Sequence, residues 1–343
     1  MEEKKFDPWQ FVGFFLIALI LTWMLYNQPP VEEVQTEIAQ TESSVDGNKV
    51  VVLDQTPNEE QLNAAYGSFA NLFQATTSEN VKIENEKLDL IFNSKGAQIS
   101  SLLLKEFNNY KEEPLFLIKE NQNFNYSFTT SDGRVLNSID FYFTPKLTER
   151  SGYQILTFTA KVSDSQFLVF EYEIKANDYM IDFSIRSEGM RSLINTREEQ
   201  NITWDLKAFR NSRSIEYENR YHLLTYGFED DKVDYLSGAS DDEEEDEEVH
   251  WISYKQHFFN SILIPTKSFD SVNFTSENLV DSDIIDQEYT KVYKTKIPVI
   301  SSGEINHNFK WYFGPTEYDT LAQYKLGIED FWLDQQVYIY THI

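Results

Sequence analysis

Histidines are the side chains in this sequence best suited to bind zinc or to transfer protons near neutral pH. The chain has five of them, and His250 and His257 lie seven positions apart. The HExxH spacing, which places two zinc ligands on one face of a helix, is absent. We therefore interpret the histidines as surface residues or as buried residues with hydrogen-bond partners. No GxSxG, P-loop or GxGxxG string occurs, so the sequence nominates no catalytic, cofactor-binding or metal-binding residue and predicts neither a cofactor nor an enzyme.

Carboxylates are far more abundant than histidines, with 57 Asp and Glu residues in 343. They are so frequent that any pair proposed as general acid and base would occur by chance. The densest group is the unbroken acidic block Asp241–Glu248 (DDEEEDEE). Because eight like charges repel one another, we predict that this block is the mobile tip of a loop that also includes Asp230, Asp231 and Asp234. The alternative is a site for a divalent cation or a basic partner, although metal sites need ligands that are fixed in space.

The balance of charge restricts the partners of the chain. With 29 Lys and Arg residues against 57 acidic ones, the net charge is -28, which opposes binding to the phosphate backbone of nucleic acid. The same charge repels an anionic lipid surface, so we expect the folded part to stay away from lipid head groups except where an anchor tethers it. The chain has no cysteine, which excludes disulfides, thiolate metal sites and cysteine nucleophiles.

One segment near the start has the composition of a transmembrane helix. Trp9–Tyr26 (WQFVGFFLIALILTWMLY) contains no charged residue, and a helix of that length spans about 27 Å, enough to cross a bilayer core. Bulky residues and proline follow it, so we predict an uncleaved signal anchor rather than a cleaved signal peptide. Lys4 and Lys5 precede the segment, whereas the next Lys or Arg is Lys49. This asymmetry predicts that residues 1–8 are cytoplasmic and that everything after the anchor lies outside.

The rest of the chain divides into a tether and a strand-rich domain. Residues 27–80 are polar and acidic without a sustained apolar period, so we expect a flexible tether. Within it, Glu59–Phe73 has a weak helical pattern that fits two alternatives, a helix docked on the domain or a transient helix in a linker. Residues 81–315 alternate polar and apolar side chains between turn residues, which predicts a large antiparallel β-sandwich rather than a parallel α/β sheet. The strand candidates include 87–92, 155–162, 167–174, 180–185, 202–206, 258–264 and 308–312.

The last segment, residues 316–343, changes pattern again. Thr316–Gly327 places Tyr318, Leu321 and Tyr324 at helical spacing before a glycine, which predicts a short amphipathic helix. The residues after 330 are apolar and aromatic but too few to span a membrane. The predicted fold class is therefore all-β dominated, with one N-terminal transmembrane helix and then a large antiparallel β-supersandwich closed by a short C-terminal helix.

Several strings in the sequence occur in the same order as in a known family. Each string is weak alone, but the ordered set is specific. The strings are Lys4–Asp7, Gly13–Pro29, Asn177–Phe183, Tyr217–Tyr221, Trp251–Phe259 and Trp311–Pro315. Together they resemble the N-terminal part of YidC-type membrane protein insertases, and the resemblance extends from residue 1 to about residue 329.

The resemblance implies a first transmembrane helix, a tether and a periplasmic β-supersandwich in the bacterial inner (plasma) membrane. It implies a part in inserting and folding integral membrane proteins, with Sec translocon components, nascent membrane proteins and the lipid bilayer as partners. In the family, five further membrane helices form a water-filled groove with an arginine that receives hydrophobic segments. This sequence departs from the family after Glu329 and stops at Ile343. We therefore expect a truncated product or a fragment, in which the groove arginine corresponds to no residue.

Two other functions stay open. The family's periplasmic domain resembles carbohydrate-binding and mutarotase-like sandwiches, and an exposed Trp204, Trp251 or Trp311 would provide the aromatic platform that sugar sites use. All three lie in strand-like runs, which favours burial in the core. The other alternative is a purely structural anchor that scaffolds proteins of the cell envelope.

Overall fold

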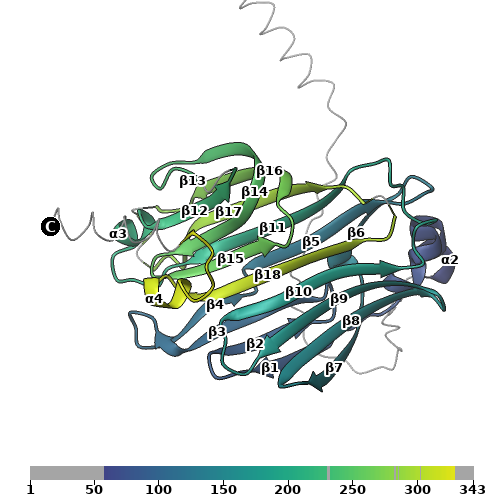
Figure 1. Ribbon diagram of the computed structural model, residues 1–343, viewed down its shortest axis with the longest axis horizontal. Coiled ribbons are helices and arrows are strands. Elements are labelled where there is room, and N and C mark those ends of the chain that lie inside the picture. The colour runs from purple at the N-terminus through teal and green to yellow at the C-terminus, as the bar shows by residue number, and fades with distance from the viewer. Residues whose placement is uncertain (1–57, 230–231, 282, 285, 302, 329–343) are drawn as a thin grey trace, which may run out of the picture. The chain divides into compact units, whose positions relative to one another are not determined.

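The computed structural model describes residues 58–229, 232–281, 283–284, 286–301 and 303–328. These residues belong to one compact unit, Asp54–Ile343, and form mainly antiparallel β-structure (Figure 1). Within these ranges no helix is both long and apolar enough to cross a bilayer. The anchor expected at residues 9–26 lies outside them, and so do Asp230 and Asp231.

Four consecutive strands form the smaller sheet, each antiparallel to the next. They are β1 (Asn80–Glu84), β2 (Leu88–Asn93), β3 (Gln98–Asn108) and β4 (Pro114–Lys119). Buried and half-buried residues alternate along β2, as expected of a strand with one face on the core. Phe92 of β2 lies 4.8 Å from Tyr172 and 6.2 Å from Phe158, measured between ring centroids. These contacts pack the smaller sheet against β8 (Tyr153–Ser163) and β9 (Gln166–Lys175) of the larger sheet.

The larger sheet has 14 strands, and all of their pairings are antiparallel, as the sequence predicted. Its main path runs through β6 (Val135–Asn137), β5 (Gln122–Thr129), β11 (Gln200–Phe209), β17 (Tyr289–Val299), β16 (Phe269–Asn278), β14 (Asp242–Gln256), β15 (Phe259–Pro265), β18 (Asn306–Pro315), β10 (Met180–Glu188), β9, β8 and β7 (Thr144–Arg150). Beside this path, β12 (His222–Phe228) pairs with β14 and β13 (Lys232–Tyr235) pairs with β12.

The long strand β14 joins the two halves of the larger sheet. Its first part, from Asp242 to Val249, pairs with β16, whereas its last part, from Ile252 to Gln256, lies between β12 and β15. Because one strand has different neighbours along its length, the sheet curls, and strands that are not adjacent in it meet face to face. Trp204 of β11 stacks on Tyr254 of β14 with ring centroids 3.8 Å apart, and the Tyr254 hydroxyl donates to the Trp204 carbonyl over 2.6 Å.

The prediction of a mobile loop at Asp241–Glu248 is wrong, because Asp242 to Glu248 form the first half of β14. Successive side chains of a strand point to opposite faces, which separates the like charges, and salt and water screen those that are exposed. Glu244 and Asp246 share one face, where their carboxylates lie 2.6 and 2.5 Å from the Tyr226 hydroxyl. Pairing with β16 therefore keeps this acidic segment in a regular strand. We had assigned it to a loop because of charge repulsion.

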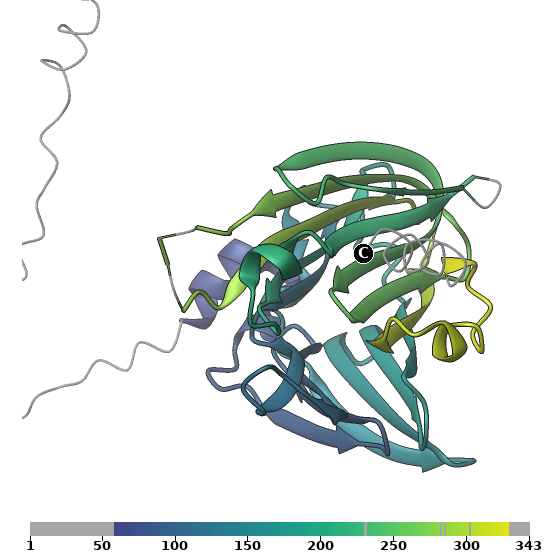
Figure 2. The same cartoon turned by 90° about the vertical axis from the view of Figure 1, so that its left-hand side faces the viewer.

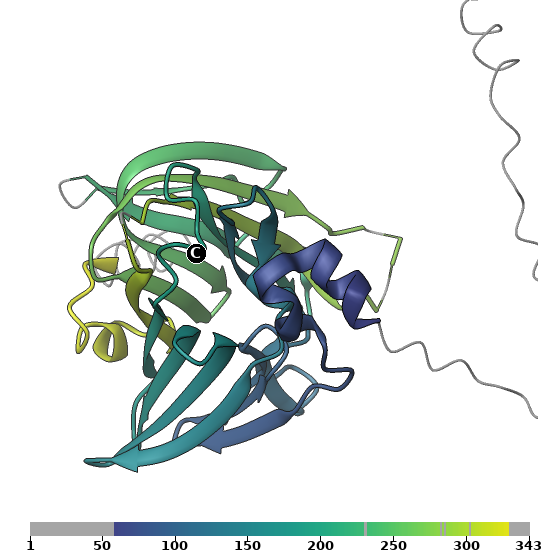
Figure 3. The ribbon, with the colours of Figure 1, turned by 90° about the vertical axis from the view of Figure 1, so that its right-hand side faces the viewer.

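Short helices lie at both ends of the domain (Figure 1). They are α2 (Glu59–Tyr66), η1 (Gly67–Phe73), η2 (Ser138–Asp140), α3 (Ile215–Asn219) and α4 (Tyr318–Leu321). The side chain of Asn58 caps α2, and the 3-10 helix η1 buries Phe69 and Leu72 in the core. The weak helical stretch in the expected tether is therefore docked on the domain, at the end that Figure 3 faces.

The helix predicted over residues 316–327 is shorter than expected. Its regular part, α4, is one turn that buries Leu321, and Lys325 then takes a left-handed backbone conformation with φ 54°. The Tyr324 hydroxyl donates to the Asp178 carboxylate over 2.6 Å. A tertiary contact, rather than helical periodicity, thus determines the path of the chain after α4.

Gly189, which follows β10, provides a test of this packing. It has a left-handed φ of +67°, and a Cβ added there would lie 2.2 Å from the Ser165 carbonyl oxygen. We expect Gly189→Ala to lower the free energy of unfolding by at least about 3 kcal/mol, because an L-residue in this conformation costs about 1–2 kcal/mol and the backbone must also shift. Urea denaturation followed by tryptophan fluorescence measures the loss.

Gly133→Ala is the matched control. Gly133 also has a positive φ, +86°, but no atom lies within 4 Å of an added Cβ. Gly133→Ala should therefore lower the free energy of unfolding by only about 1–2 kcal/mol, because only the backbone conformation is unfavourable for alanine. Equal losses for the two variants would contradict the steric argument.

Candidate functional site

The two histidines considered from the sequence have different partners. His250 Nδ1 lies 2.8 Å from Ser268 Oγ, and its Nε2 contacts the Glu229 carbonyl. His257 Nδ1 lies 3.0 Å from Ser212 Oγ. Both histidines therefore have hydrogen-bond partners, as predicted, whereas the buried Nε2 of His307 has none among the described residues, contrary to the prediction. Within the described ranges, no group of three or more His, Cys, Asp or Glu residues could hold a metal ion.

The three tryptophans considered as a sugar platform are buried. Trp204, Trp251 and Trp311 are each at most 5% exposed. The Trp204 Nε1–H donates to Gln122 Oε1 over 3.0 Å, and the rings of Trp204 and Trp311 meet edge to face with centroids 5.4 Å apart. Core side chains cannot stack on a sugar ring, so these residues form no carbohydrate platform.

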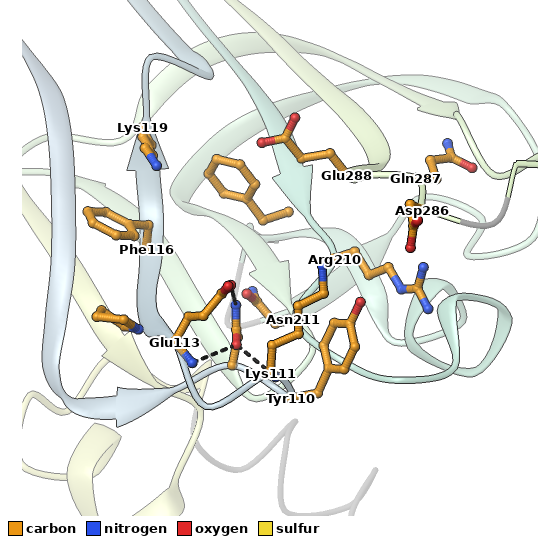
Figure 4. A pocket seen from close by; sticks show the side chains of 13 residues that line it. Tyr110, Lys111, Glu113, Phe116, Lys119, Arg210, Asn211, Asp286, Gln287 and Glu288 are labelled. Atoms are coloured by element: carbon orange, nitrogen blue, oxygen red, sulfur yellow. Dashed lines mark hydrogen bonds between the residues drawn. The ribbon is translucent and has the colours of Figure 1, made fainter.

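An open pocket of about 550 Å³ lies between three segments of the chain (Figure 4). One wall is the connection from β3 to β4 together with β4, the second is the end of β11 with the residues after it, and the third is the segment before β17. The Tyr110 N–H donates to the Asn211 carbonyl over 3.1 Å, and the Arg210 N–H donates to the Glu288 carbonyl over 2.8 Å. These backbone bonds tie the second wall to the other two.

Charges of both signs line this pocket, as Figure 4 shows. The cationic side chains are Lys111, Lys119 and Arg210, and the acidic ones are Glu113, Asp286 and Glu288. The Arg210 guanidinium lies 5.3 Å from the centre of the Tyr110 ring. The pocket therefore offers both donors and acceptors, which suits a polar peptide segment better than a uniformly anionic ligand.

A buried carboxylate fixes the second wall from behind. Glu218 of α3 is fully buried, and its two oxygens accept the N–H groups of Asn211 and Ser212 over 2.8 and 3.0 Å. His222 Nε2 lies 3.4 Å away. Burial would raise the pKa of Glu218, but the contact with His222 and the two N–H groups hold that pKa below its usual range. Glu218 is thus ionised at neutral pH and anchors the backbone beside the pocket.

Two lysines lie in the same buried region. Burial lowers the pKa of Lys255 to about 7 and the pKa of Lys291 to about 8. The Lys291 ammonium donates to the Gly238 carbonyl over 2.9 Å. Burial also lowers the pKa of His222. The contact with Glu218 opposes this effect and the charges of Lys291 and Lys255 add to it, and the pKa remains below its usual value. His222 is therefore neutral, with its Nδ1 2.5 Å from Thr290 Oγ1.

The sequence nominated none of these buried charged groups. The one available signal was a Glu and a His four residues apart, a spacing that places side chains on one face of a helix, but the structure places Glu218 in α3 and His222 at the start of β12. No comparable signal existed for Lys255 and Lys291, since a lysine in a strand is normally read as facing solvent.

The comparisons with known proteins agree with one another. Residues 80–333 match the family described as YidC periplasmic domain. A membrane protein insertase YidC from Parabacteroides distasonis is 26% identical over 340 residues, and one from Azobacteroides pseudotrichonymphae is 30% identical over 319 residues. The alignments cover 92% and 91% of this chain but 53% and 50% of those proteins. The chain thus spans about half the length of the curated relatives it matches.

Solved structures include more distant neighbours. A galactose mutarotase related enzyme from Lactobacillus acidophilus is 10% identical, with 68% of this chain and 97% of the other covered and a TM-score of 0.39. A likeness at that level supports no inference about sugars.

Glu218→Gln tests the buried carboxylate. The amide keeps the shape but has one acceptor oxygen and no charge for two N–H groups. We expect the free energy of unfolding at pH 7 to fall by about 2–3 kcal/mol, because hydrogen bonds to buried charged groups contribute about 1.5–3 kcal/mol. The folded-state pKa of Glu218 is lowered from 4.5, so the contribution is present above that pH and is lost as the pH falls through the folded pKa.

Urea denaturation at pH 7 and at pH 3 measures this difference. Glu216→Gln is the control, since Glu216 is exposed on the same helix; it should change stability by less than about 0.5 kcal/mol at either pH. If Glu218→Gln lost no more stability than Glu216→Gln, Glu218 would not hold the pocket wall at Asn211 and Ser212.

Lys255→Met tests the buried amine. The pKa of Lys255 is about 7 in the folded chain against an ordinary value of 10.5, so between these values the unfolded chain binds a proton that the folded chain does not. Stability therefore rises with pH across this window. We expect the free energy of unfolding to rise from pH 7 to pH 9 by roughly 2 kcal/mol more in the wild type than in Lys255→Met. Lys207→Met is the control, because Lys207 is exposed; it should leave the pH dependence of the free energy of unfolding as in the wild type. If Lys255→Met also had the wild-type pH dependence, the lowered pKa of Lys255 would be disproved.

Proposed function

The chain belongs to the YidC family of membrane protein insertases through its periplasmic domain, and on that premise we propose that it is the N-terminal and periplasmic part of such an insertase. In this role it helps integral membrane proteins to insert and fold, alone or with the Sec translocon. The observation that carries the proposal is the family match over residues 80–333, which includes both sheets and α4.

The proposed topology follows the charges near the start of the sequence. Residues 1–8 are cytoplasmic, 9–26 cross the inner membrane once, and 27–80 link this anchor to the sandwich of 81–315, with 316–343 after it. Lys4 and Lys5 before the apolar segment support this orientation, since positive residues stay on the cytoplasmic side.

The domain is proposed to bind and position partners rather than to catalyse. Glu218 and His222 are of the types that make acid and base pairs, but both are fully buried, so a substrate would not reach them. The pocket is the proposed docking place for a polar segment of a translocon component or of a nascent membrane protein. Its paired cationic and acidic side chains support this choice.

A photoactivatable amino acid at Lys111 tests the proposal in the full chain in its native membrane. We expect light to cross-link position 111 to translocon subunits or to nascent membrane proteins. The same amino acid at Val135, which is 67% exposed on β6, should capture far less of them. If position 111 captured only unrelated envelope proteins, a scaffold function would replace the proposed one.

A further inference from the structure

Exposed aromatic side chains gather around α3 and the turn between β14 and β15. Tyr217 is 45% exposed and Phe258 is 65% exposed. The rings of Tyr217 and Tyr221 lie 5.0 Å apart, both lie within 6 Å of the His257 ring, and that ring lies 3.7 Å from Phe258. The four rings are in contact with one another, with Tyr217 and Phe258 exposed and His257 itself buried. The helix α3 that carries Tyr217 lies at the end of the domain that Figure 2 faces.

The turn holds Phe258 outward by specific contacts. His257 has a left-handed φ of 57°, a conformation that usually selects glycine or asparagine. Its side chain is held by Ser212, 3.0 Å away, and the Phe258 carbonyl accepts the Thr316 N–H over 2.6 Å. A large apolar ring thus occupies a turn position that is ordinarily polar, and the neighbouring contacts fix it there.

The charge around these rings differs from that of the chain as a whole. The segment that carries Tyr217 and Tyr221 has two exposed cations, Arg213 and Arg220, and its acidic side chains are the exposed Glu216 and the buried Glu218. The chain has a net charge of -28, but at physiological ionic strength charges beyond about 8 Å are largely screened. The charges close to the rings therefore decide what this surface attracts, and Arg213 and Arg220 provide exposed positive charge there.

We propose that this aromatic and basic face, formed by Tyr217, Tyr221, Phe258, Arg213 and Arg220, contacts the head-group region of an anionic lipid bilayer. Tyrosine and arginine are suited to that region, because they combine an apolar body with a polar end. Basic side chains near the surface are attracted by anionic lipids.

The inference rests on the proposed function, because a chain anchored in the bilayer holds its domain at high effective concentration beside the lipid. A weak contact is then enough to orient the domain. The expectation that the folded part stays away from head groups is revised for this one face.

A spin label tests the contact in the full chain, with one copy in each lipid nanodisc. The chain has no cysteine, so Glu216→Cys on α3 places a single label beside the face. Collision with oxygen, which concentrates in lipid, is compared with collision with a water-soluble nickel chelate. We expect the oxygen-to-nickel ratio at position 216 to be several-fold higher in discs that contain phosphatidylglycerol than in phosphatidylcholine discs.

Two controls accompany the label. Val135→Cys in a Glu216→Gln background has the same charge change and reports on the other end of the domain (Figure 1), and its ratio should be low in both lipids. Adding Phe258→Ser, Arg213→Glu and Arg220→Glu to the label at 216 should return its ratio to the phosphatidylcholine value. Adding Leu147→Ser and Lys267→Glu, at exposed positions on β7 and before β16, should leave it unchanged.

The outcomes separate this inference from the function it rests on. Failure of the chain to enter the discs would overturn both. A label at 216 that is as accessible to nickel as the label at 135, in discs that hold the chain, would overturn the lipid contact alone. Shielding from both reagents would also overturn it, in favour of contact with protein.

Discussion

The structure depends on one strand that belongs to two sets of neighbours. Over its length β14 pairs first with β16 and then with β12 and β15, which forces the larger sheet to curl and brings β11 opposite β14. The stacked Trp204 and Tyr254 fill the space between them, and the Tyr254 hydroxyl bonds to Trp204 and Thr295. A buried phenol without such partners would cost free energy. Aromatic side chains such as Trp204 and Tyr254 therefore hold together strands that face each other across the curl.

The curl of the larger sheet determines where the pocket lies, and the buried carboxylate of Glu218 makes its wall rigid. The segment after β11 leaves the sheet, passes the pocket and enters α3, where Glu218 turns back to bind its N–H groups. One ionised side chain thus holds the pocket wall on one side and the basic, aromatic α3 region on the other. Desolvation makes such a group costly unless it is hydrogen-bonded, and here both of its oxygens are bonded to backbone.

Periodicity and the resemblance carried the sequence analysis a long way and then failed for identifiable reasons. Alternation of side chains identified antiparallel strands and placed the three tryptophans in the core, because burial on one face leaves a period of two. The acidic block was assigned to a loop because its charges were counted along the sequence. In a strand, successive side chains point to opposite faces, which separates these charges. The helix after residue 316 was overextended because Asp178, which binds Tyr324, is distant in sequence. Lys255 and Lys291 were missed because nothing local distinguishes a buried lysine from an exposed one.

The acidic half of β14 also bears on how the domain behaves at high concentration. Among the described strands, β16 is the only partner of Asp242 to Glu247, so the other edge of this stretch presents backbone groups that a second chain could extend into a shared sheet. Strand edges of this kind template aggregation unless charge or shape discourages it. A row of carboxylates along the edge repels an identical row on another copy. The charges that argued against order in this segment therefore help to keep separate copies apart.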